Sequence, residues 1–167
     1  MYYIGYDLGS SSVKVAILNA QTGEKLVALN EPENEMEIIA VHTDWAEQDP
    51  NKWWAYTCKA TQRAIKEANI DASKIVGIGI SYQMHGLVVV DKQGEPLRDS
   101  IIWCDSRAVD IGNKAFTEIG EEKCADKLLN SPGNFTASKL KWVRDNEPEV
   151  YAQIYKYMLP GDFIAYK

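Results

Sequence analysis

The first residues that could perform chemistry lie near the N-terminus, in the run Asp-Leu-Gly-Ser-Ser-Ser-Val-Lys at positions 7–14. A tight turn of glycine and small residues, here centred on Gly9, lets backbone N–H groups converge on an anion. Three hydroxyls add donors and Lys14 adds a positive charge. No sequence neighbour obviously neutralises Asp7, and a carboxylate beside a phosphate site makes sense when Mg²⁺ lies between them, usually through water. The three hydroxyls are those of Ser10, Ser11 and Ser12. The run predicts a phosphate site; a surface hairpin with a polar turn is the alternative.

A second polar segment, Ser-Tyr-Gln-Met-His-Gly at 81–86, comes at the end of an apolar run at 75–81. The end of a central strand is a favoured place for a ligand, because the strand holds the segment rigidly. Gln83 and His85 can donate and accept hydrogen bonds, which suits sugar hydroxyls. Met84 offers an adaptable apolar wall, and Gly86 permits a close backbone approach. A histidine satisfied within the core is the alternative for His85.

A third segment, Trp-Cys-Asp-Ser-Arg at 103–107, offers an aromatic ring and two opposite charges. Trp103 could stack on the apolar face of a sugar or pack in the core. Asp105 and Arg107 could bind hydroxyls or pair with each other. Alternatively, Asp105 caps the following helix and Arg107 lies on the surface of that helix.

The pattern of apolar residues indicates strands in a meander, followed by alternating helices and strands, which predicts a mixed sheet with helical layers. The Ile-Val-Gly-Ile-Gly-Ile-Ser run at 75–81 is typical of a strand buried on both sides. Segment 31–49 is polar and predicted to be mainly loop. Strands are expected at 2–7, 13–18, 25–29, 75–81, 87–91, 101–103 and 155–159, helices at 50–67, 108–120 and 136–146, and a turn at 160–162 before a final helix.

Composition narrows the class of protein. A net charge of −6 argues against a nucleic-acid binder, which needs clustered Lys and Arg. The sequence shows neither a signal peptide nor an apolar run long enough for a membrane span. Three widely spaced cysteines, Cys58, Cys104 and Cys124, form no metal-binding spacing and are expected to be free thiols in a cytoplasmic protein.

Taken together, these motifs resemble those of the FGGY carbohydrate kinases, and within that family the xylulose kinases most closely. The hairpin at 4–14 alone resembles the first phosphate motif of the wider superfamily of sugar kinases, heat-shock protein 70 and actin. The resemblance runs the length of the chain, and its other carriers are the segments at 45–50 with 53–54, 83–86, 103–107 and 159–163.

The resemblance implies a ribonuclease H-like (actin-like ATPase) α/β fold, with a mixed sheet that starts as an antiparallel meander and helices on both faces. It implies ATP and Mg²⁺ as cofactors, with Asp7, Gly9, Ser10, Ser11, Ser12 and Lys14 at the phosphates and Asp7 helping to place the metal. It implies sugar contacts for the segments that hold Met84, His85, Trp103, Asp105 and Arg107. Glu47 and Gln48 match a family pattern that we interpret as anchoring the loop before the helix.

Residues 1–167 are therefore expected to be an N-terminal domain, apparently truncated and inactive alone, whose ATP-binding C-terminal domain and catalytic Asp lie beyond Lys167. The expected reaction of the full protein is phosphorylation of D-xylulose to D-xylulose 5-phosphate. The alternatives are another substrate of the family (gluconate, ribulose or glycerol) or an actin-like or chaperone-like ATPase that binds protein. Family members often form homodimers, but the sequence does not indicate which surface would be used.

Overall fold

A computed structural model describes all residues, 1–167, as two compact units, each assembled from separate stretches of the chain. The first unit comprises Met1–Glu37, Asn51–Gln83 and Gly161–Lys167, and the second comprises Ile38–Pro50 and Met84–Pro160. No helix in the structure is both long enough and apolar enough to span a bilayer.

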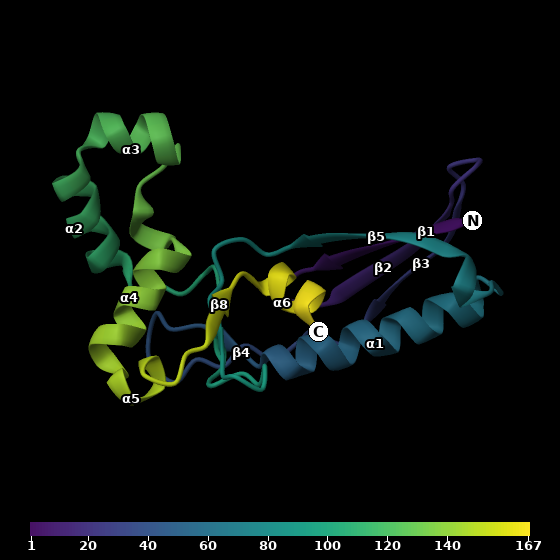
Figure 1. Ribbon diagram of the computed structural model, residues 1–167, viewed down its shortest axis with the longest axis horizontal. Helices are drawn as coiled ribbons and strands as arrows, with labels where there is room; N and C mark the ends of the chain where they lie inside the picture. Colours follow the sequence, from purple (N-terminus) through teal and green to yellow (C-terminus); the bar gives the residue numbers. More distant parts are fainter. The chain divides into compact units, whose positions relative to one another are not determined.

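The first unit is built on a four-stranded sheet in the order β3-β2-β1-β5, in which three strands form the predicted antiparallel meander and β5 runs parallel to β1 (Figure 1). A parallel neighbour requires a crossover, and helix α1 supplies it. The bounds are β1 Tyr2–Leu8, β2 Val13–Asn19, β3 Lys25–Glu31, α1 Pro50–Glu67, a 3₁₀ turn at Ala72–Lys74, β5 Ile75–Tyr82 and α6 Pro160–Tyr166.

Helix α1 covers one face of this sheet, and the core lies between them. Ala60 and Ala64 of α1 pack against Ile4, Val15 and Ile17 of the strands. Trp53 of the same helix is also fully buried. Burial of these side chains, at about 25 cal/mol per Å² of apolar surface, is what holds the helix on the sheet.

One prediction about the layers of this sheet needs correction. Strand β5 is not buried on both sides, since Val76 is 51% exposed and Ile78 is 66% exposed. Ile78 instead lines an open apolar groove of about 600 Å³ with residues of α1 and α6. Helix α6 lines this groove together with α1. An apolar run indicates that a strand favours apolar contacts, but it does not show which elements of the chain supply them.

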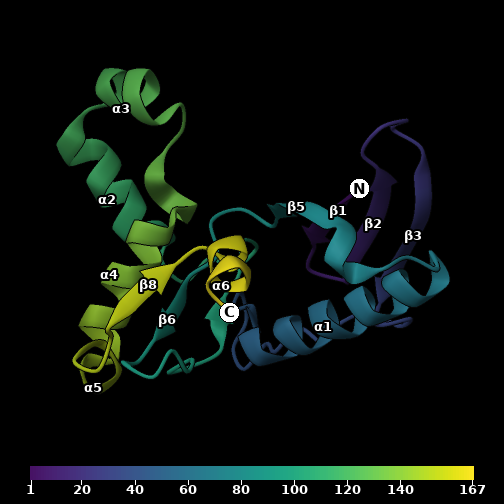
Figure 2. The same ribbon diagram turned by 45° about the vertical axis from the view of Figure 1, so that its right-hand side comes forward.

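The second unit contains two small antiparallel pairs of strands and a group of helices; β6 and β8 lie side by side in Figure 2. Its core is formed by Leu87, Val89, Ile101 and Val143. The bounds are β4 Glu47–Gln48, β6 Val88–Val90, β7 Ser100–Ile101, α2 Val109–Ile119, α3 Glu121–Leu128, a 3₁₀ turn at Pro132–Asn134, α4 Thr136–Asn146, α5 Pro148–Tyr151 and β8 Lys156–Met158.

Most elements of this unit were predicted within one or two residues, and the differences have local causes. The two-residue strand β4 was predicted as loop, because it exists only through pairing with β7. Helix α3 was not predicted, and Pro148 both ends α4 and begins the short helix α5, as proline can at a first helical position. Likewise α6 begins at Pro160, where a turn was expected.

Candidate active site

The β1–β2 hairpin places the predicted phosphate residues at one end of the first unit. The strands pair as far as Leu8 opposite Val13, and the intervening loop closes with a hydrogen bond from Gly9 N–H to Ser12 O of 3.0 Å. The chain after β3 braces this loop, because Met36 N–H donates to Ser11 O at 2.8 Å. The glycine and the three serines therefore form one fixed turn, as predicted.

The charges of the hairpin are paired, which corrects the expectation that Asp7 lacks a partner. The antiparallel register sets Asp7 directly opposite Lys14, and Lys14 Nζ lies 3.1 Å from Asp7 Oδ2. Both side chains are about half exposed, so the pair is weak and can rearrange around a ligand.

The open face of the sheet continues from this pair as a shallow groove of about 330 Å³. Gly5, Ala16 and Ala28 lie side by side across three strands and form its floor, because they carry little or no side chain. One carboxylate suits Mg²⁺, which commonly takes one or two protein carboxylates and completes its shell with phosphate oxygens and water. No cluster of three or more acidic, His or Cys side chains forms a metal cage in the chain.

Gln83 extends the β5 strand beyond its last residue and lies beside the same hairpin. Its N–H donates to Leu8 O at 2.8 Å, and the residue is 9% exposed. The structure therefore brings Gln83 together with the phosphate loop in the first unit. The remaining predicted sugar residues belong to the second unit.

Within the second unit, Met84 and Trp103 present their side chains to solvent, at 63% and 45% exposure. His85, which follows Met84, has a left-handed backbone, with φ of 61°, and its ring stacks on Phe135 at 4.9 Å. Burial, with a contribution from the charge of Lys139, lowers the pKa of His85 below its usual 6.5. The lowered pKa favours the neutral imidazole at neutral pH, in which one nitrogen can donate to a hydroxyl and the other can accept from one.

Gly86 has a specific steric role in this segment. A Cβ at this position would lie 2.5 Å from Cγ of Pro160, so only glycine allows the chain to pass there without displacing the proline ring. The absence of a side chain at Gly86 therefore makes room for Pro160.

Asp105 and Arg107 pair with each other, which was one of the alternatives open from sequence. Arg107 Nε lies 2.9 and 3.0 Å from the two Asp105 oxygens, and Arg107 Nη2 lies 2.7 Å from Oδ2. Both side chains are almost fully buried, at 0% and 1% exposure, so Arg107 does not lie on a helix surface. Asp105 Oδ2 also accepts from Ala46 N–H at 2.6 Å.

Arg107 is enclosed by a ring of partners from distant parts of the chain, which we call the Arg107 cluster. The guanidinium lies 3.7 Å from the ring centre of Trp45 and 4.9 Å from that of Trp142. Its Nη1 lies 2.6 Å from Glu47, which also pairs with Arg98. The structure therefore supports the interpretation of Glu47 as an anchor. The cluster consists of Trp45, Glu47, Arg98, Asp105, Arg107, Trp142 and Glu147, the last paired with Arg98 at 2.6 Å.

Sequence reasoning missed Lys139, a fully buried lysine in α4. Its Nζ donates to the carbonyl oxygens of His85, at 2.9 Å, and Asn134, at 3.1 Å. Burial lowers its pKa from 10.5 to about 8. A signal was available, because Lys139 stands four residues before the buried Val143 and so on the apolar face of the helix.

Comparison with known proteins identifies the family. Residues 2–167 match the N-terminal domain of the FGGY family of carbohydrate kinases. The chain is 39% identical over 164 residues to a xylulose kinase of Escherichia coli K12, covering 97% of this chain and 32% of that protein. It is 34% identical over 171 residues to a xylulose kinase of Bacillus subtilis 168, covering 99% of this chain and 32% of that protein.

Solved structures agree with this assignment. A xyloylose kinase from Brucella ovis superposes with a TM-score of 0.86 at 32% identity, over 99% of this chain and 34% of that one. The chain thus spans about a third of the length of the relatives it matches. Its mixed sheet is that of the actin-like ATPase fold, and the chain belongs to the FGGY family of carbohydrate kinases as part of the N-terminal domain.

Proposed function

We propose that the protein containing this chain transfers the terminal phosphoryl group of ATP to a hydroxyl of D-xylulose, giving D-xylulose 5-phosphate. The observation that carries the proposal is the family match over residues 2–167, joined to relatives named xylulose kinase at up to 39% identity. The exposed apolar groups of Met84 and Trp103 beside a neutral His85 support a sugar as the acceptor.

The hairpin of the first unit is the proposed phosphate side of the site. Gly9, Ser10, Ser11, Ser12 and Lys14 would contact ATP phosphates, and Asp7 would hold Mg²⁺ through water. Bound Mg²⁺ supplies charge neutralisation for the phosphates. The weak ion pair between Lys14 and Asp7 supports this role, because exposed charges exchange partners at little cost.

The proposed sugar side has contact residues and supporting residues. Gln83, Met84, His85, Gly86 and Trp103 are the proposed contacts. Asp105 and Arg107 already satisfy each other and are buried, so we propose that they act mainly by fixing the segment that carries Trp103. Removing either charge should then affect stability as strongly as sugar affinity.

We further propose that the catalytic base is an Asp in the part of the protein that this chain does not contain, since the relatives are about three times longer. The 167-residue chain alone should then show no sugar-dependent release of ADP, because the base must reach the attacking hydroxyl. The free thiols of Cys58, Cys104 and Cys124 support a reducing compartment such as the cytoplasm.

The decisive experiment measures ADP release by the full-length protein with D-xylulose, ribulose, gluconate and glycerol as acceptors. We expect the highest kcat/KM with D-xylulose. Asp7→Asn should lower kcat roughly 100-fold, the usual scale for one electrostatic group in a site. Its matched control, Asp126→Asn on the surface of α3, should leave kcat unchanged, since Asp126 pairs only with its neighbour Lys127.

Three outcomes would contradict the proposal. A higher kcat/KM with gluconate, ribulose or glycerol would reassign the substrate within the family. ATP turnover stimulated by unfolded protein clients and not by sugars would indicate an actin-like or chaperone-like ATPase. Robust xylulose-dependent turnover by the 167-residue chain alone would show that the base lies within it.

A further inference from the structure

Lys139 is the only lysine of the chain with no exposed surface, and it lies in the middle of α4. Burying an ammonium group is costly unless its donors are satisfied. Lys139 forms no ion pair within 4 Å; two backbone carbonyl oxygens accept its hydrogen bonds instead. Asp105 and Cys104 act on it electrostatically in its favour and Arg107 acts against it. A methionine or leucine would fill such a site at less cost, so the two hydrogen bonds are what distinguishes the lysine.

The first of these bonds holds a strained residue. His85 is in the left-handed region, with φ of 61°, which costs a residue with a side chain on the order of 1 kcal/mol and persists only where its surroundings enforce it. Three contacts enforce it. They are the bond from Lys139 Nζ to His85 O, the stacking of Phe135 on the imidazole, and a 3.3 Å bond from Thr136 Oγ1 to the carbonyl of Gly86.

The second bond reaches the other segment of the site. Lys139 Nζ binds the carbonyl oxygen of Asn134, and the side-chain amide of Asn134 donates to the carbonyl oxygen of Trp103. The Lys139 ammonium therefore lies where the His85 segment and the Trp103 segment are joined. The linking segment, 134–139, comes from neither of them.

We propose that Lys139 is a positioning residue, which holds His85 in its left-handed conformation and, through Asn134, fixes the distance between the His85 and Trp103 segments. The sugar-binding consequence rests on the proposed function, whereas the effect on His85 does not. Lys139 touches neither substrate nor reacting atoms in this proposal. Its effect is to keep two contact segments in one arrangement before the sugar arrives, so that binding does not have to order them.

The first test reads the imidazole directly, in the 167-residue chain. The chain has two histidines, His42 and His85, so a ¹H–¹⁵N spectrum of labelled histidine resolves one probe and one internal reference. Lys139→Met should raise the pKa of His85 and alter its ring shifts, because the ammonium charge and the carbonyl bond are both lost. His42 should be unchanged, and Lys139→Arg should retain part of the wild-type behaviour.

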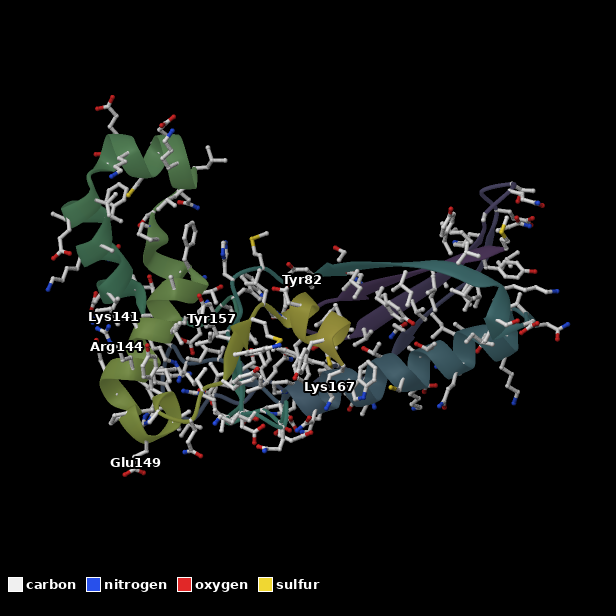
Figure 3. All side chains as sticks on the ribbon, in the orientation of Figure 1. Tyr82, Lys141, Arg144, Glu149, Tyr157 and Lys167 are labelled. Carbon is white, nitrogen blue, oxygen red and sulfur yellow. The ribbon has the colours of Figure 1, made fainter.

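Lys141→Met is the matched control. Lys141 stands two residues further along α4, where Figure 3 shows it with Arg144, and both pair with Asp145 at the surface. This variant should leave both imidazoles unchanged. An unaltered His85 titration and ring shift in folded Lys139→Met would overturn the proposal, leaving Lys139 as packing only. If circular dichroism shows Lys139→Met to be unfolded, the kinetic test of Asn134→Ala described next decides whether the link between the two segments matters. This variant removes the side-chain link to Trp103 and leaves the lysine in place.

The second test uses kinetics of the full-length protein. Lys139→Met should raise the KM for D-xylulose about tenfold, on the scale of one lost charge-assisted bond, with the KM for ATP within about twofold of wild type. Asn134→Ala loses a neutral hydrogen bond and should raise the KM for D-xylulose by less, about fivefold. A lower melting temperature with both KM values unchanged would refute the positioning role. If the wild-type protein phosphorylates no sugar, the proposed function fails, and the His85 spectrum still decides the role of Lys139.

Discussion

Replacing Asp105 by asparagine tests whether the buried ion pairs of the Arg107 cluster contribute strongly to the stability of the second unit. The carboxylate accepts from Ala46 N–H and Arg107 Nη2 on Oδ2, from Arg107 N–H on Oδ1, and from Arg107 Nε on both. An asparagine must place its NH₂ group at one of these two positions. Either orientation sets an N–H donor against at least two other donors, so the amide cannot reproduce the carboxylate in any rotamer.

The expected cost follows from burial. Removing one partner from a buried ion pair destabilises by roughly 3–5 kcal/mol, because the other charge stays buried. Glu47 still pairs with Arg107 at 2.6 Å, which places Asp105→Asn near the lower end, at about 3 kcal/mol. For a chain of this size, each kcal/mol shifts the melting temperature by about 2–4 °C, so a decrease of roughly 6–12 °C is expected.

Urea unfolding followed by tryptophan fluorescence provides the measurement, because Trp45 and Trp142 both face the Arg107 guanidinium. The surface variant Asp126→Asn is the control and should change the free energy of unfolding by no more than about 0.5 kcal/mol. A loss below about 1 kcal/mol in Asp105→Asn would refute the assignment. A double variant that also carries Arg107→Met should lose less than the sum of the single variants, since it removes both unpaired charges.

Three further predictions follow from burial and sterics. Between pH 8 and 10.5, Lys139 is largely deprotonated in the folded chain and still protonated in the unfolded chain. The free energy of unfolding of the wild type, relative to that of Lys139→Met, should therefore rise by up to about 3 kcal/mol over this range. Urea titrations at several pH values measure this difference. Burial tends to raise the pKa of Glu31, but hydrogen bonds from two basic side chains outweigh this effect and lower that pKa. The extra stability of the wild type over Glu31→Gln should therefore be present above pH 4.5 and lost as the pH falls below it. Acid unfolding curves that kept the same separation at every pH would contradict this prediction. Gly112→Ala should destabilise by more than about 2 kcal/mol in thermal unfolding, because its Cβ would lie 2.2 Å from Gly133 Cα, whereas Gly79→Ala meets no atom within 4 Å and should be tolerated. Equal melting temperatures for the two glycine variants would contradict the packing described here.

The parts of the fold that sequence predicts well are those set by neighbouring residues. Strands β1 to β3 and helix α1 were predicted almost to the residue, because alternation, turn residues and the proline at position 50 act locally. The hairpin chemistry was also accessible, since its residues are contiguous. Its register was not used, although pairing Leu8 with Val13 places Asp7 opposite Lys14 and so predicts their ion pair.

The parts that sequence predicts poorly depend on distant partners. Asp105 and Arg107 looked like polar groups available to a ligand, and only Glu47, about sixty residues earlier, and Trp142 show that they are enclosed. The spacing of Lys139 from Val143 indicates the apolar face of α4, but this lysine was not singled out from the sequence. Its hydrogen-bond acceptor His85 O lies 54 residues earlier in the chain, beyond the reach of any local pattern.

The Arg107 cluster also has a consequence for the order in which the chain is synthesised. The hydrogen bond from Ala46 N–H to Asp105 Oδ2 joins residues that are 59 positions apart in the sequence. At about 5–20 residues per second, a ribosome needs roughly 3–12 s to make that stretch. During this time Trp45 and Glu47 have been synthesised, but the arginine that contacts both of them has not. The segment 38–50 can therefore form these contacts only after Arg107 has been added to the chain.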